Sequence, residues 1–579
     1  MSPELLDYPG PAGAAPDGGG AAGAFHRAGV EAIRAERHAR GAELIAEAIR
    51  LDPAEGDYYA DLGVALMRLG EGEAAEAGFR AAIHLKPQGP APYNSLGALL
   101  IEQGRLEQAE AVLRQAVALH PRFSEAHGNL GCVLQARGRA AEARLVFYRA
   151  LRLSPYSANL YANLGVALTD LGKVEAAADS FAAALHLCPD LIDAWCGYGG
   201  ALCQMGRLDE ALAAFDEALA RRPACAAAHN DRGVALQRLG RWEEAIAAFR
   251  ETLRLDPGHP DALANLGLVL LLLGRYEEGW PAHEGRWRSR YMALGLRHFE
   301  QPQWDGEPFD GTLLVHAEQG LGDTLQFCRY APRLAERQRV VFEVQPSLVS
   351  LLRRTMGDVE VVARGAPLPP FEAHCPLMSL PLLFGSTLGT IPAPAAYLAA
   401  DPAKVRAWAE RLAGLKGLRC GLVWAGGARP GQPQVAATDG RRSLSLHQLA
   451  PLGRAPGVSF VSLQKGPAAA QAAEPPPGLT LLDLTHDLHD FDDTAGLVAN
   501  LDLVISVDTA VAHLAGALGK PTWLLNRFDT CWRWLLGRED SPWYPSVRIF
   551  RQPGPGAWTA PIEAMGQALA QAAVCEPIR

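Results

Sequence analysis

The sequence predicts an all-α repeat array followed by two α/β halves, each built on a parallel sheet. In the first half of the 579-residue chain, glycines recur every 34 residues, a step typical of stacked helical pairs. After residue 311, short apolar runs alternate with helical segments, which is typical of strands buried on both faces. We therefore expect the following segments: a disordered lead (1–21), an array of about eight units (22–293), a linker (294–311) and two α/β halves (312–400 and 401–579).

The repeat unit is defined by three residue ladders that share the 34-residue step. One glycine stands inside the first helix of each pair, where its small size lets the second helix approach. A bulky side chain 16 positions later fills the remaining gap. A second glycine marks the turn between the helices, and a proline ends the second helix. The ladders are Gly63, Gly97, Gly131, Gly165, Gly199, Gly233 and Gly267; Gly70, Gly104, Gly138, Gly172, Gly206, Gly240 and Gly274; and Pro53, Pro87, Pro121, Pro155, Pro189, Pro223 and Pro257.

This pattern resembles the tetratricopeptide repeat (TPR) family. The resemblance covers residues 22–293, with a degenerate first unit around Gly29. The last unit diverges from Arg275 onward, where it loses the bulky position and the final proline, so a cap or docking element is expected there. Such a solenoid has no catalytic chemistry of its own and offers a long concave surface to a protein partner.

A short polar residue stands two positions before the first glycine of most units. These side chains recur on one face, so they are candidates for a groove that grips the backbone of an extended peptide. An asparagine ladder at this position resembles the array of nucleocytoplasmic O-linked N-acetylglucosamine transferases. The alternative is that short polar residues only solvate an inner helix face, and the two interpretations have equal weight. The candidate groove residues are Asn129, Asn163, Asp231 and Asn265.

Composition argues against several classes of protein. The formal net charge is -10 and the chain has no long basic run, which disfavours a nucleic-acid partner. The ten cysteines form no CxxC pair, which argues against a disulfide framework or zinc site and fits a reducing cytoplasm. The longest apolar run, residues 266–274, is too short to span a bilayer, and the N-terminus does not resemble a secretory signal. We therefore expect a soluble, cytoplasmic protein that does not span a membrane.

The most informative segment of the second half is NLDLVISVDTAVAHLAGALGKPTWLLN, residues 500–526. A strand is expected to end at Val507, with Asp508 and Thr509 capping a helix that carries His513 one turn inside. Ala510, which follows the cap, is a further donor-binding candidate. Free backbone N–H groups at such a helix start favour a phosphate, and the histidine can add a donor. The alternative is a structural N-cap with a histidine in the core.

A second informative segment is HAEQGLGDTLQFCRYAP, residues 316–332, in which a strand leads through a glycine turn into a helix. GLGD is not GxGxxG and lacks the lysine of a nucleoside triphosphate loop, so dinucleotide binding is poorly supported. Gln319, Gly320 and Gly322 belong to the turn. Asp323 follows it, and on this pattern alone it is also compatible with a helix cap.

These two segments resemble motifs of the heptosyltransferase-like glycosyltransferases (glycosyltransferase family 9). SVDTAVAHLAGALGKPTW is similar to their donor-site motif, and HAEQGLGDTLQFCRYAP is similar to their N-terminal motif. The resemblance spans residues 312–551 and implies a GT-B fold of two Rossmann-like halves. The first half would face the acceptor and the second would hold the nucleotide-sugar, with no metal or other cofactor required. It also implies that Gly320 and Gly322 let the acceptor come close, and that Asp323 is the general base for the attacking hydroxyl.

Further candidates for donor binding follow other strands of the second half. Gly426 and Gly427 end a strand and would let the backbone approach the nucleotide. Lys465 stands where a cation could neutralise the leaving diphosphate, or it is a solvated loop lysine. Arg441 and Arg442 fall roughly where the resembling enzymes carry a basic phosphate-binding residue.

Three other stretches have competing interpretations. The insertion before Arg441, residues 428–440, departs from the compact family pattern and is read as either a lid or a disordered loop. Residues 490–494, DFDDT, mimic a metal-binding DxD motif, but the start of a helical run favours an N-cap cluster. Residues 532–545 are rich in aromatics that could stack on a base or sugar, whereas core packing is the commoner explanation.

The combination of repeats and transferase motifs resembles bacterial TPR-containing glycosyltransferases. The leading interpretation is an enzyme that moves a sugar from a nucleotide-sugar donor to a hydroxyl of a protein, such as flagellin, that the repeats select. A second keeps the chemistry but places the acceptor on a lipopolysaccharide-type saccharide. A third is a TPR scaffold whose transferase-like part is inactive.

Overall fold

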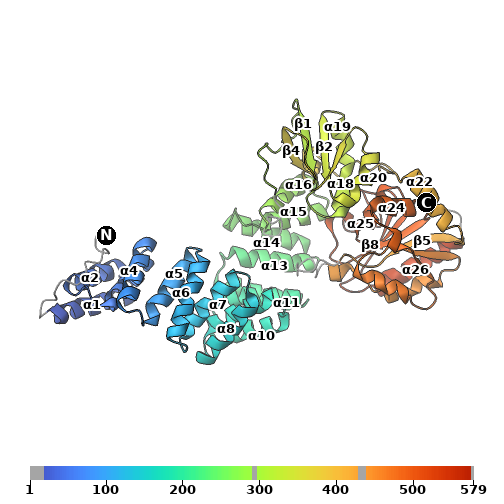
Figure 1. Ribbon diagram of the computed structural model, residues 1–579. Helices are drawn as coiled ribbons and strands as arrows, with labels where there is room; N and C mark the ends of the chain where they lie inside the picture. Colours follow the sequence, from blue (N-terminus) through green and yellow to red (C-terminus); the bar gives the residue numbers. More distant parts are fainter. Residues whose placement is uncertain (1–17, 290–296, 428–438, 575–579) are drawn as a thin grey trace. The chain divides into compact units, whose positions relative to one another are not determined.

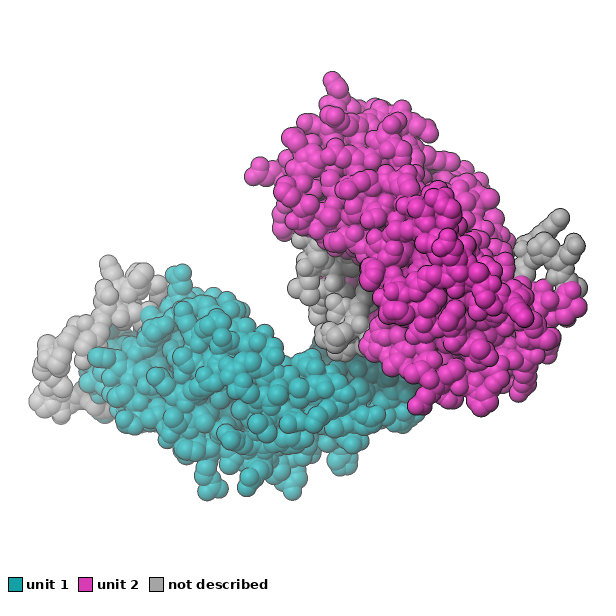
Figure 2. Space-filling view, turned by 45° about the vertical axis from the view of Figure 1, so that its right-hand side comes forward, with its two compact units in different colours: residues 1–223 teal, residues 224–579 magenta. Residues whose placement is uncertain are grey.

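The structure is a computed structural model that describes residues 18–289, 297–427 and 439–574 (Figure 1). The chain divides into two compact units, residues 1–223 and 224–579, which Figure 2 colours separately. We call them unit 1 and unit 2. Within the described ranges, no helix has both the length and the apolar character needed to cross a membrane.

Unit 1 consists of consecutive helices that pack against one another in sequence order. In each pair the ladder glycine lies under the bulky residue, so that a Cβ on Gly63 would meet the Phe79 ring at 2.7 Å and one on Gly131 would meet Phe147 at 2.5 Å. At the turn between the helices the second glycine is left-handed, with φ of 79° at Gly70. The helices are α1 (Gly18–Arg34), α2 (His38–Leu51), α3 (Gly56–Arg68), α4 (Gly72–Leu85), α5 (Pro90–Glu102), α6 (Leu106–Leu119), α7 (Ser124–Ala136), α8 (Ala140–Leu153), α9 (Ala158–Asp170), α10 (Val174–Leu187), α11 (Ile192–Gln204) and α12 (Leu208–Arg221).

The first helix begins earlier than the sequence predicts. Residues 18–21, expected in the lead, already belong to α1, and residues 1–17 lie outside the described part of the chain. The degenerate first unit is a genuine helical pair, in which a Cβ on Gly29 would meet Ile45 at 2.5 Å. Its helices therefore pack as closely as those of the regular units.

Unit 2 begins with four more repeat helices. They are α13 (Ala226–Arg238), α14 (Trp242–Leu255), α15 (Ala262–Leu272) and α16 (Tyr276–His283), followed by the short 3-10 helix η2 (Glu284–Trp287). The boundary between the compact units thus lies two helical pairs before the predicted domain boundary at 293/294.

The last helical pair shares a hydrophobic core with the α/β part. Trp280 of α16 is 2% exposed, and its ring centroid lies 5.3 Å from that of Trp532 and 6.3 Å from that of Trp543. Its indole Nε1 donates a hydrogen bond of 2.8 Å to the carbonyl of Ser386. The divergent last unit is therefore a docking element that is built into the α/β fold.

The first α/β half contains a parallel four-stranded sheet in the order β3-β2-β1-β4. The central strand β1 pairs with β2 and with β4, so that Leu314 lies beside Val341 and His374. The strands are β1 (Thr312–His316), β2 (Arg339–Val344), β3 (Glu360–Ala363) and β4 (Ala373–Pro376).

The second half contains a parallel six-stranded sheet in the order β10-β9-β8-β5-β6-β7. In chain order this is the doubly wound 3-2-1-4-5-6 arrangement, whose topological switch point lies between β5 and β8. Ligands of such sheets bind at the carboxyl ends of the strands that flank the switch point. The strands are β5 (Leu418–Val423), β6 (Val458–Ser462), β7 (Leu481–Asp483), β8 (Leu503–Val507), β9 (Thr522–Asn526) and β10 (Val547–Arg551).

Helices connect these strands and cover the sheets (Figure 1). Those of the first half are α18 (Leu321–Phe327), η3 (Cys328–Tyr330), α19 (Ala331–Ala335), η4 (Pro346–Leu348), α20 (Val349–Thr355), η5 (Leu377–Ser379) and α21 (Leu380–Leu383). Those of the second half are α22 (Pro402–Arg411), η6 (Leu446–Arg454), η7 (Pro467–Ala473), η8 (Thr485–Asp487), α24 (Phe491–Ala499), α25 (Ala510–Ala517), η9 (Trp532–Trp534) and α26 (Thr559–Val574).

Candidate functional site

The N-terminus of α25 lies at the switch point of the larger sheet. Strand β8 ends at Val507, and Thr509 is the N-cap residue of the helix, in extended conformation. The Thr509 hydroxyl shares a hydrogen bond of 2.9 Å with Ser506 instead of capping the helix. The predicted strand end at Val507 and the helix that follows it are therefore confirmed, whereas the predicted capping by the Thr509 side chain is wrong. The first N–H groups of α25 lie at the carboxyl edge of the sheet, where an anion would be stabilised.

Arg442 joins the ends of β5 and β8. One of its Nη atoms donates a hydrogen bond of 2.8 Å to the Asp508 carbonyl, and the other forms an ion pair with Asp439. Gly426, just beyond β5, accommodates this guanidinium, because a Cβ there would lie 2.7 Å from the Arg442 Nε. The structure thus gathers Gly426, Arg442 and Asp508 at one edge of the sheet.

His513 is buried one turn inside α25. Its Nδ1 shares a hydrogen bond of 2.8 Å with the Tyr544 hydroxyl, and its ring stacks on Trp534 at a centroid distance of 5.3 Å. The Nε2 atom lies 3.9 Å from Asp508 Oδ1. Burial lowers the pKa of His513 to about 4, although the Asp508 carboxylate acts in the opposite direction. The imidazole is therefore neutral near pH 7 and acts as a hydrogen-bonding group.

The glycine turn of the first half packs directly on α25. Gly320 is the N-cap residue of α18, and a Cβ on Gly322 would meet the His513 Cδ2 at 2.8 Å and the Ala510 Cα at 3.5 Å. Only glycine fits this close approach of the two helices. The two sequence motifs, almost 200 positions apart, therefore meet at one place in the fold.

Asp323 lies at this meeting point with both carboxylate oxygens engaged. Its Oδ2 accepts a hydrogen bond of 2.7 Å from the backbone N–H of Gly320, and its Oδ1 forms an ion pair with Arg533. The side chain is 19% exposed. Asp323 is thus a capping residue of α18 and a link to the second half, and its role as a general base stays a prediction.

Arg533 is a site residue that sequence reasoning missed. Its side chain is 10% exposed and donates hydrogen bonds of 2.7 Å to Gln326 and 3.1 Å to the Cys531 Sγ, besides pairing with Asp323. Its guanidinium stacks over Trp532 at 4.3 Å from the ring centroid. The signal in the sequence was the WRW triplet, in which a cation stands between two aromatics that both turn out to be buried.

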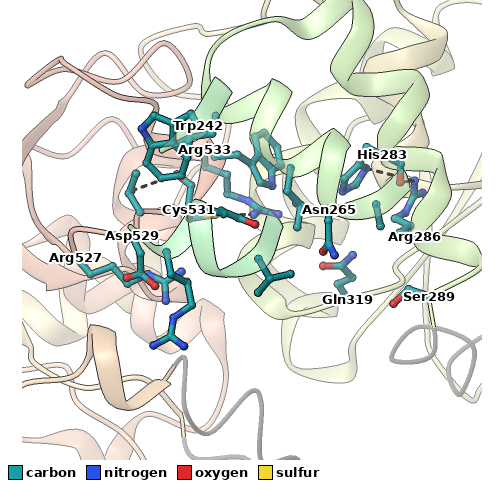
Figure 3. Close-up of a pocket in the computed structure, with 18 of the residues that line it drawn as sticks. Trp242, Asn265, His283, Arg286, Ser289, Gln319, Arg527, Asp529, Cys531 and Arg533 are labelled. Atoms are coloured by element: carbon teal, nitrogen blue, oxygen red, sulfur yellow. Dashed lines mark hydrogen bonds and ion pairs between the residues drawn. The ribbon is translucent and has the colours of Figure 1, made fainter. Parts of the chain in front are cut away.

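A pocket of about 450 Å³ opens within unit 2 beside these residues (Figure 3). Its walls come from the helices α13 to α15, from the glycine turn through Gln319, and from the segment that follows β9. In Figure 3, Asn265 of α15 and Gln319 extend toward each other across the cavity. The repeat helices and both α/β halves therefore contribute to one cavity.

A buried ion pair holds the end of the helical array against the glycine turn. The Arg286 guanidinium makes two hydrogen bonds, of 2.8 and 3.0 Å, to the Glu318 carboxylate, and these side chains are 3% and 4% exposed. Glu318 also accepts a hydrogen bond of 2.8 Å from the backbone N–H of Met378, beyond β4. Burial raises the pKa of Glu318, against the lowering effect of Arg286. The position of Gln319, the next residue, depends on this contact.

Other predicted donor residues lie elsewhere or have structural partners. The Lys465 ammonium donates to the backbone carbonyls of Thr485 and Leu488, at 2.7 and 2.8 Å, so in this structure it braces a loop. Gly427 has open space around its Cα. Arg441 lines the pocket, and its Nε donates a hydrogen bond of 2.9 Å to Asp529.

For residues 490–494 the interpretation as a helix cap is confirmed, and for the tryptophans of residues 532–545 the interpretation as core packing is confirmed. Asp490 is the N-cap of α24 and accepts hydrogen bonds from the backbone N–H groups of Asp492 and Asp493. Trp534 and Trp543 are fully buried in the core. Most of the insertion, residues 428–438, lies outside the described ranges. Within those ranges, no group of three or more His, Cys, Asp or Glu side chains is placed to hold a metal ion.

Several candidate groove residues form hydrogen bonds between neighbouring repeats. The Asn129 amide donates 2.9 Å to Asn94, and the Asn265 amide donates 3.2 Å to Asn230, each one repeat back. Asn163 reaches the Cys132 Sγ at 3.3 Å. This inter-repeat role was not predicted, and it leaves peptide binding by the same amides as a prediction.

The buried His513 gives unit 2 a stability that depends on pH. Because its folded pKa of about 4 lies below the usual 6.5, the unfolded chain binds more protons between these values, and stability falls as the pH falls through this window. We expect His513→Gln to reduce the loss of unfolding free energy between pH 7 and pH 5 by about 2 kcal/mol. Urea unfolding at both pH values measures this change, with the exposed His447→Gln as control. Equal slopes for the wild type and His513→Gln would contradict it.

The helical part of the chain matches a known family. A family model described as tetratricopeptide repeat matches residues 26–90, 95–158, 201–260 and 231–279, and a second model of that description matches residues 158–191. These helices are tetratricopeptide repeats. The predicted TPR array is therefore confirmed, and the same models include the TPR helices that line the pocket of unit 2.

Curated and solved proteins resemble parts of the chain. Protein FlbA of Caulobacter vibrioides is 31% identical over 308 residues, which cover 48% of this chain and 50% of that protein. The chain thus spans about half the length of the curated relative that it matches. YrrB, a TPR protein described as having an unusual peptide-binding site, is 28% identical over 32% of this chain and 95% of its own, with a TM-score of 0.28. TTC0263, a TPR protein of Thermus thermophilus, is 24% identical over 32% of this chain and 100% of its own, with a TM-score of 0.28.

Proposed function

We propose that this chain is a metal-independent glycosyltransferase of the GT-B type that moves a sugar from a nucleotide-sugar donor to a hydroxyl group of a protein bound by its TPR array. One observation carries the proposal. The glycine turn of the first half and the N-terminus of α25 meet at Gly322 and His513, at the carboxyl edge of a doubly wound sheet. This is where such a fold binds its ligand.

In this proposal the donor diphosphate lies at the N-terminus of α25. Backbone N–H groups and the positive end of the helix dipole stabilise the negative charge that develops as the sugar leaves. Arg442, fixed by its bond to the Asp508 carbonyl and by its ion pair with Asp439, adds a guanidinium group at the same edge. The neutral His513 adds hydrogen bonding without competing for a proton.

The acceptor hydroxyl would enter from the side of the first half. Asp323 would take its proton, with Gly320 allowing the backbone to lie close to the acceptor, whereas the space beside Gly322 is filled by His513. The Arg533 ion pair fixes the orientation of the Asp323 carboxylate. The acceptor hydroxyl would then reach the carboxylate lone pairs that accept no hydrogen bond from Gly320 or Arg533. The TPR array would select the protein that carries this hydroxyl, with flagellin as one candidate.

The same ion pair also favours a second candidate function. Because both oxygens of Asp323 have partners within the chain, the residue would be equally well explained as a link between halves of a binding scaffold. A scaffold of this kind would bind partner proteins through the repeats without turning over a nucleotide-sugar. Ligand binding at α25 separates the two functions.

A nucleotide panel tests the proposal on the full chain. We expect one class of nucleoside diphosphate to raise the melting temperature, since a ligand at 100 times its Kd adds about 2.7 kcal/mol of stability. Ala510→Pro should abolish most of this shift, because proline fits the first position of a helix but removes one N–H group. Arg442→Gln should weaken it, whereas the exposed Arg454→Gln of the same half should not. A shift that survives Ala510→Pro and Arg442→Gln would place the nucleotide elsewhere, and no shift with any nucleotide would favour the scaffold.

A further inference from the structure

Three arginines from three separate segments line the pocket of unit 2 on one side. Arg238 ends α13 in the TPR array, Arg441 precedes η6, and Arg527 follows β9. The segments are packed together, because a Cβ on Gly240, in the turn after α13, would lie 3.5 Å from the Phe528 ring. We call these three residues the arginine cluster.

Asp529 is the carboxylate that Arg441 and Arg527 share. Arg441 Nε donates to Asp529 Oδ2 at 2.9 Å, and Arg527 Nε lies 3.6 Å from Asp529 Oδ1. The Arg527 side chain is 12% exposed, and its Nε and Nη1 are buried without a hydrogen-bond partner among the described residues. A buried donor of this kind is costly unless a ligand satisfies it.

The guanidinium groups of the cluster lie close enough to affect one another. Burial lowers the pKa of Arg441, and the neighbouring Arg527 and Arg238 lower it further, against the effect of Asp529. Like charges in a partly buried cavity repel one another at a reduced dielectric constant. An anion bound beside Arg527 would offset the repulsion between like charges and supply the acceptor that its buried Nε and Nη1 lack.

We propose that the arginine cluster is a binding site for a phosphate or carboxylate group, formed jointly by the TPR array and the α/β part. It is separate from the proposed diphosphate site at α25. The consecutive residues Arg441 and Arg442 diverge, the first toward Asp529 and the second toward the Asp508 carbonyl. Planar guanidinium groups recognise both anions through paired hydrogen bonds.

The size of the pocket indicates that the anion belongs to a larger ligand. About 450 Å³ is within the usual range for small-molecule sites and far exceeds the volume of a single anion. The remaining walls carry amide groups, from Asn265 and Gln319, and the indole of Trp242. The anionic group therefore comes either from the donor molecule or from an acidic group of the acceptor.

Inorganic phosphate is the probe for the first test, on the full-length protein. We expect phosphate to raise its melting temperature relative to chloride at equal ionic strength, and Arg527→Gln to lose most of that rise. In chloride, Arg527→Gln should melt at about the wild-type temperature, because it removes buried N–H groups that lack a hydrogen-bond partner, and Asp529 keeps its hydrogen bond from Arg441. Arg442→Gln and the exposed Arg454→Gln should both keep the phosphate response.

Two results would overturn the proposal. One is an Arg527→Gln variant that melts lower in chloride and still gains as much from phosphate as the wild type, which would make Arg527 a structural residue only. The other is a phosphate response that only Arg442→Gln removes, which would assign the anion to the α25 site. Acetate in place of phosphate tests whether a carboxylate is also accepted.

A titration with a nucleoside diphosphate tests whether the two sites are distinct. If it removes the phosphate response that depends on Arg527, the diphosphate itself occupies the arginine cluster, and the proposal of a separate site is overturned. If the two ligands give additive shifts, the sites are distinct. A nucleotide-sugar with a carboxylate on the sugar then removes the Arg527-dependent response if the donor supplies the anion, and leaves it if the acceptor does. These measurements need no turnover, so they test the arginine cluster even if no sugar transfer is found. The loss of the nucleotide shift in Ala510→Pro, in contrast, tests the proposed function alone.

Discussion

Replacing Asp323 by asparagine is expected to lower the rate of the proposed sugar transfer by roughly 100- to 10,000-fold. Asparagine keeps an oxygen that can accept the Gly320 N–H but cannot take a proton from the acceptor hydroxyl. A transfer assay with the donor class found in the nucleotide panel measures the loss. Unchanged turnover by this variant would eliminate Asp323 as the base.

The ion pair with Arg533 requires a matched control, because losing it affects structure as well as chemistry. Arg533→Gln breaks the same pair from the other side while leaving the Asp323 carboxylate in place. If both variants lose transfer equally, the broken link between the halves is responsible. If Asp323→Asn loses far more, the carboxylate itself acts in the reaction. Thermal unfolding of both variants shows how much of each loss is structural.

Replacing Arg286 by methionine is expected to reduce the unfolding free energy of unit 2 by about 3–5 kcal/mol, the usual effect of leaving one partner of a buried ion pair alone. Glu318 would lose both of its Arg286 hydrogen bonds while 4% exposed. Urea unfolding of the full chain, followed by tryptophan fluorescence, measures the change. All the tryptophans except Trp195 lie in unit 2, so this signal reports mainly on unit 2.

The same helical segment offers a control for this prediction. Arg250→Met removes an ion pair with Glu278, in which the side chains are 54% and 55% exposed, and exposed pairs contribute at most about 1 kcal/mol. The double variant Arg286→Met, Glu318→Gln should recover part of the loss, because it leaves no lone charge on Glu318. Equal effects of Arg250→Met and Arg286→Met would show that the Arg286 pair adds nothing beyond an exposed one.

The repeat array could be predicted from the sequence because its constraints are local and periodic. Gly63 must be small where the Phe79 ring lies against it, and Gly70 must adopt a left-handed conformation. Each constraint leaves the same residue at the same place in every unit. The start of α25 was predictable for a similar reason, since its strand, cap and helix follow one another directly in the chain.

The contacts that assemble the site could not be predicted in this way. Asp323 and Arg533 are 210 positions apart, and nothing in either local pattern indicates the other. Gly322 was read as a turn residue, whereas the approach of His513 is what requires a glycine there. Such pairings depend on how two separate sheets pack, which residue spacing does not encode.

The inclusion of the last two helical pairs in unit 2 affects how this chain could be rearranged. Helix α16 contributes Trp280 to the core, and η2, which follows it, contributes Arg286 to the contact with the glycine turn. A chain that starts at residue 294 would therefore expose apolar surface and lose a wall of the pocket. The part that could be exchanged for another array ends at Pro223. Shuffling of repeats during evolution, or grafting by design, would therefore be tolerated up to that point, and a new binding specificity could be fitted to the same unit 2 without rebuilding its core.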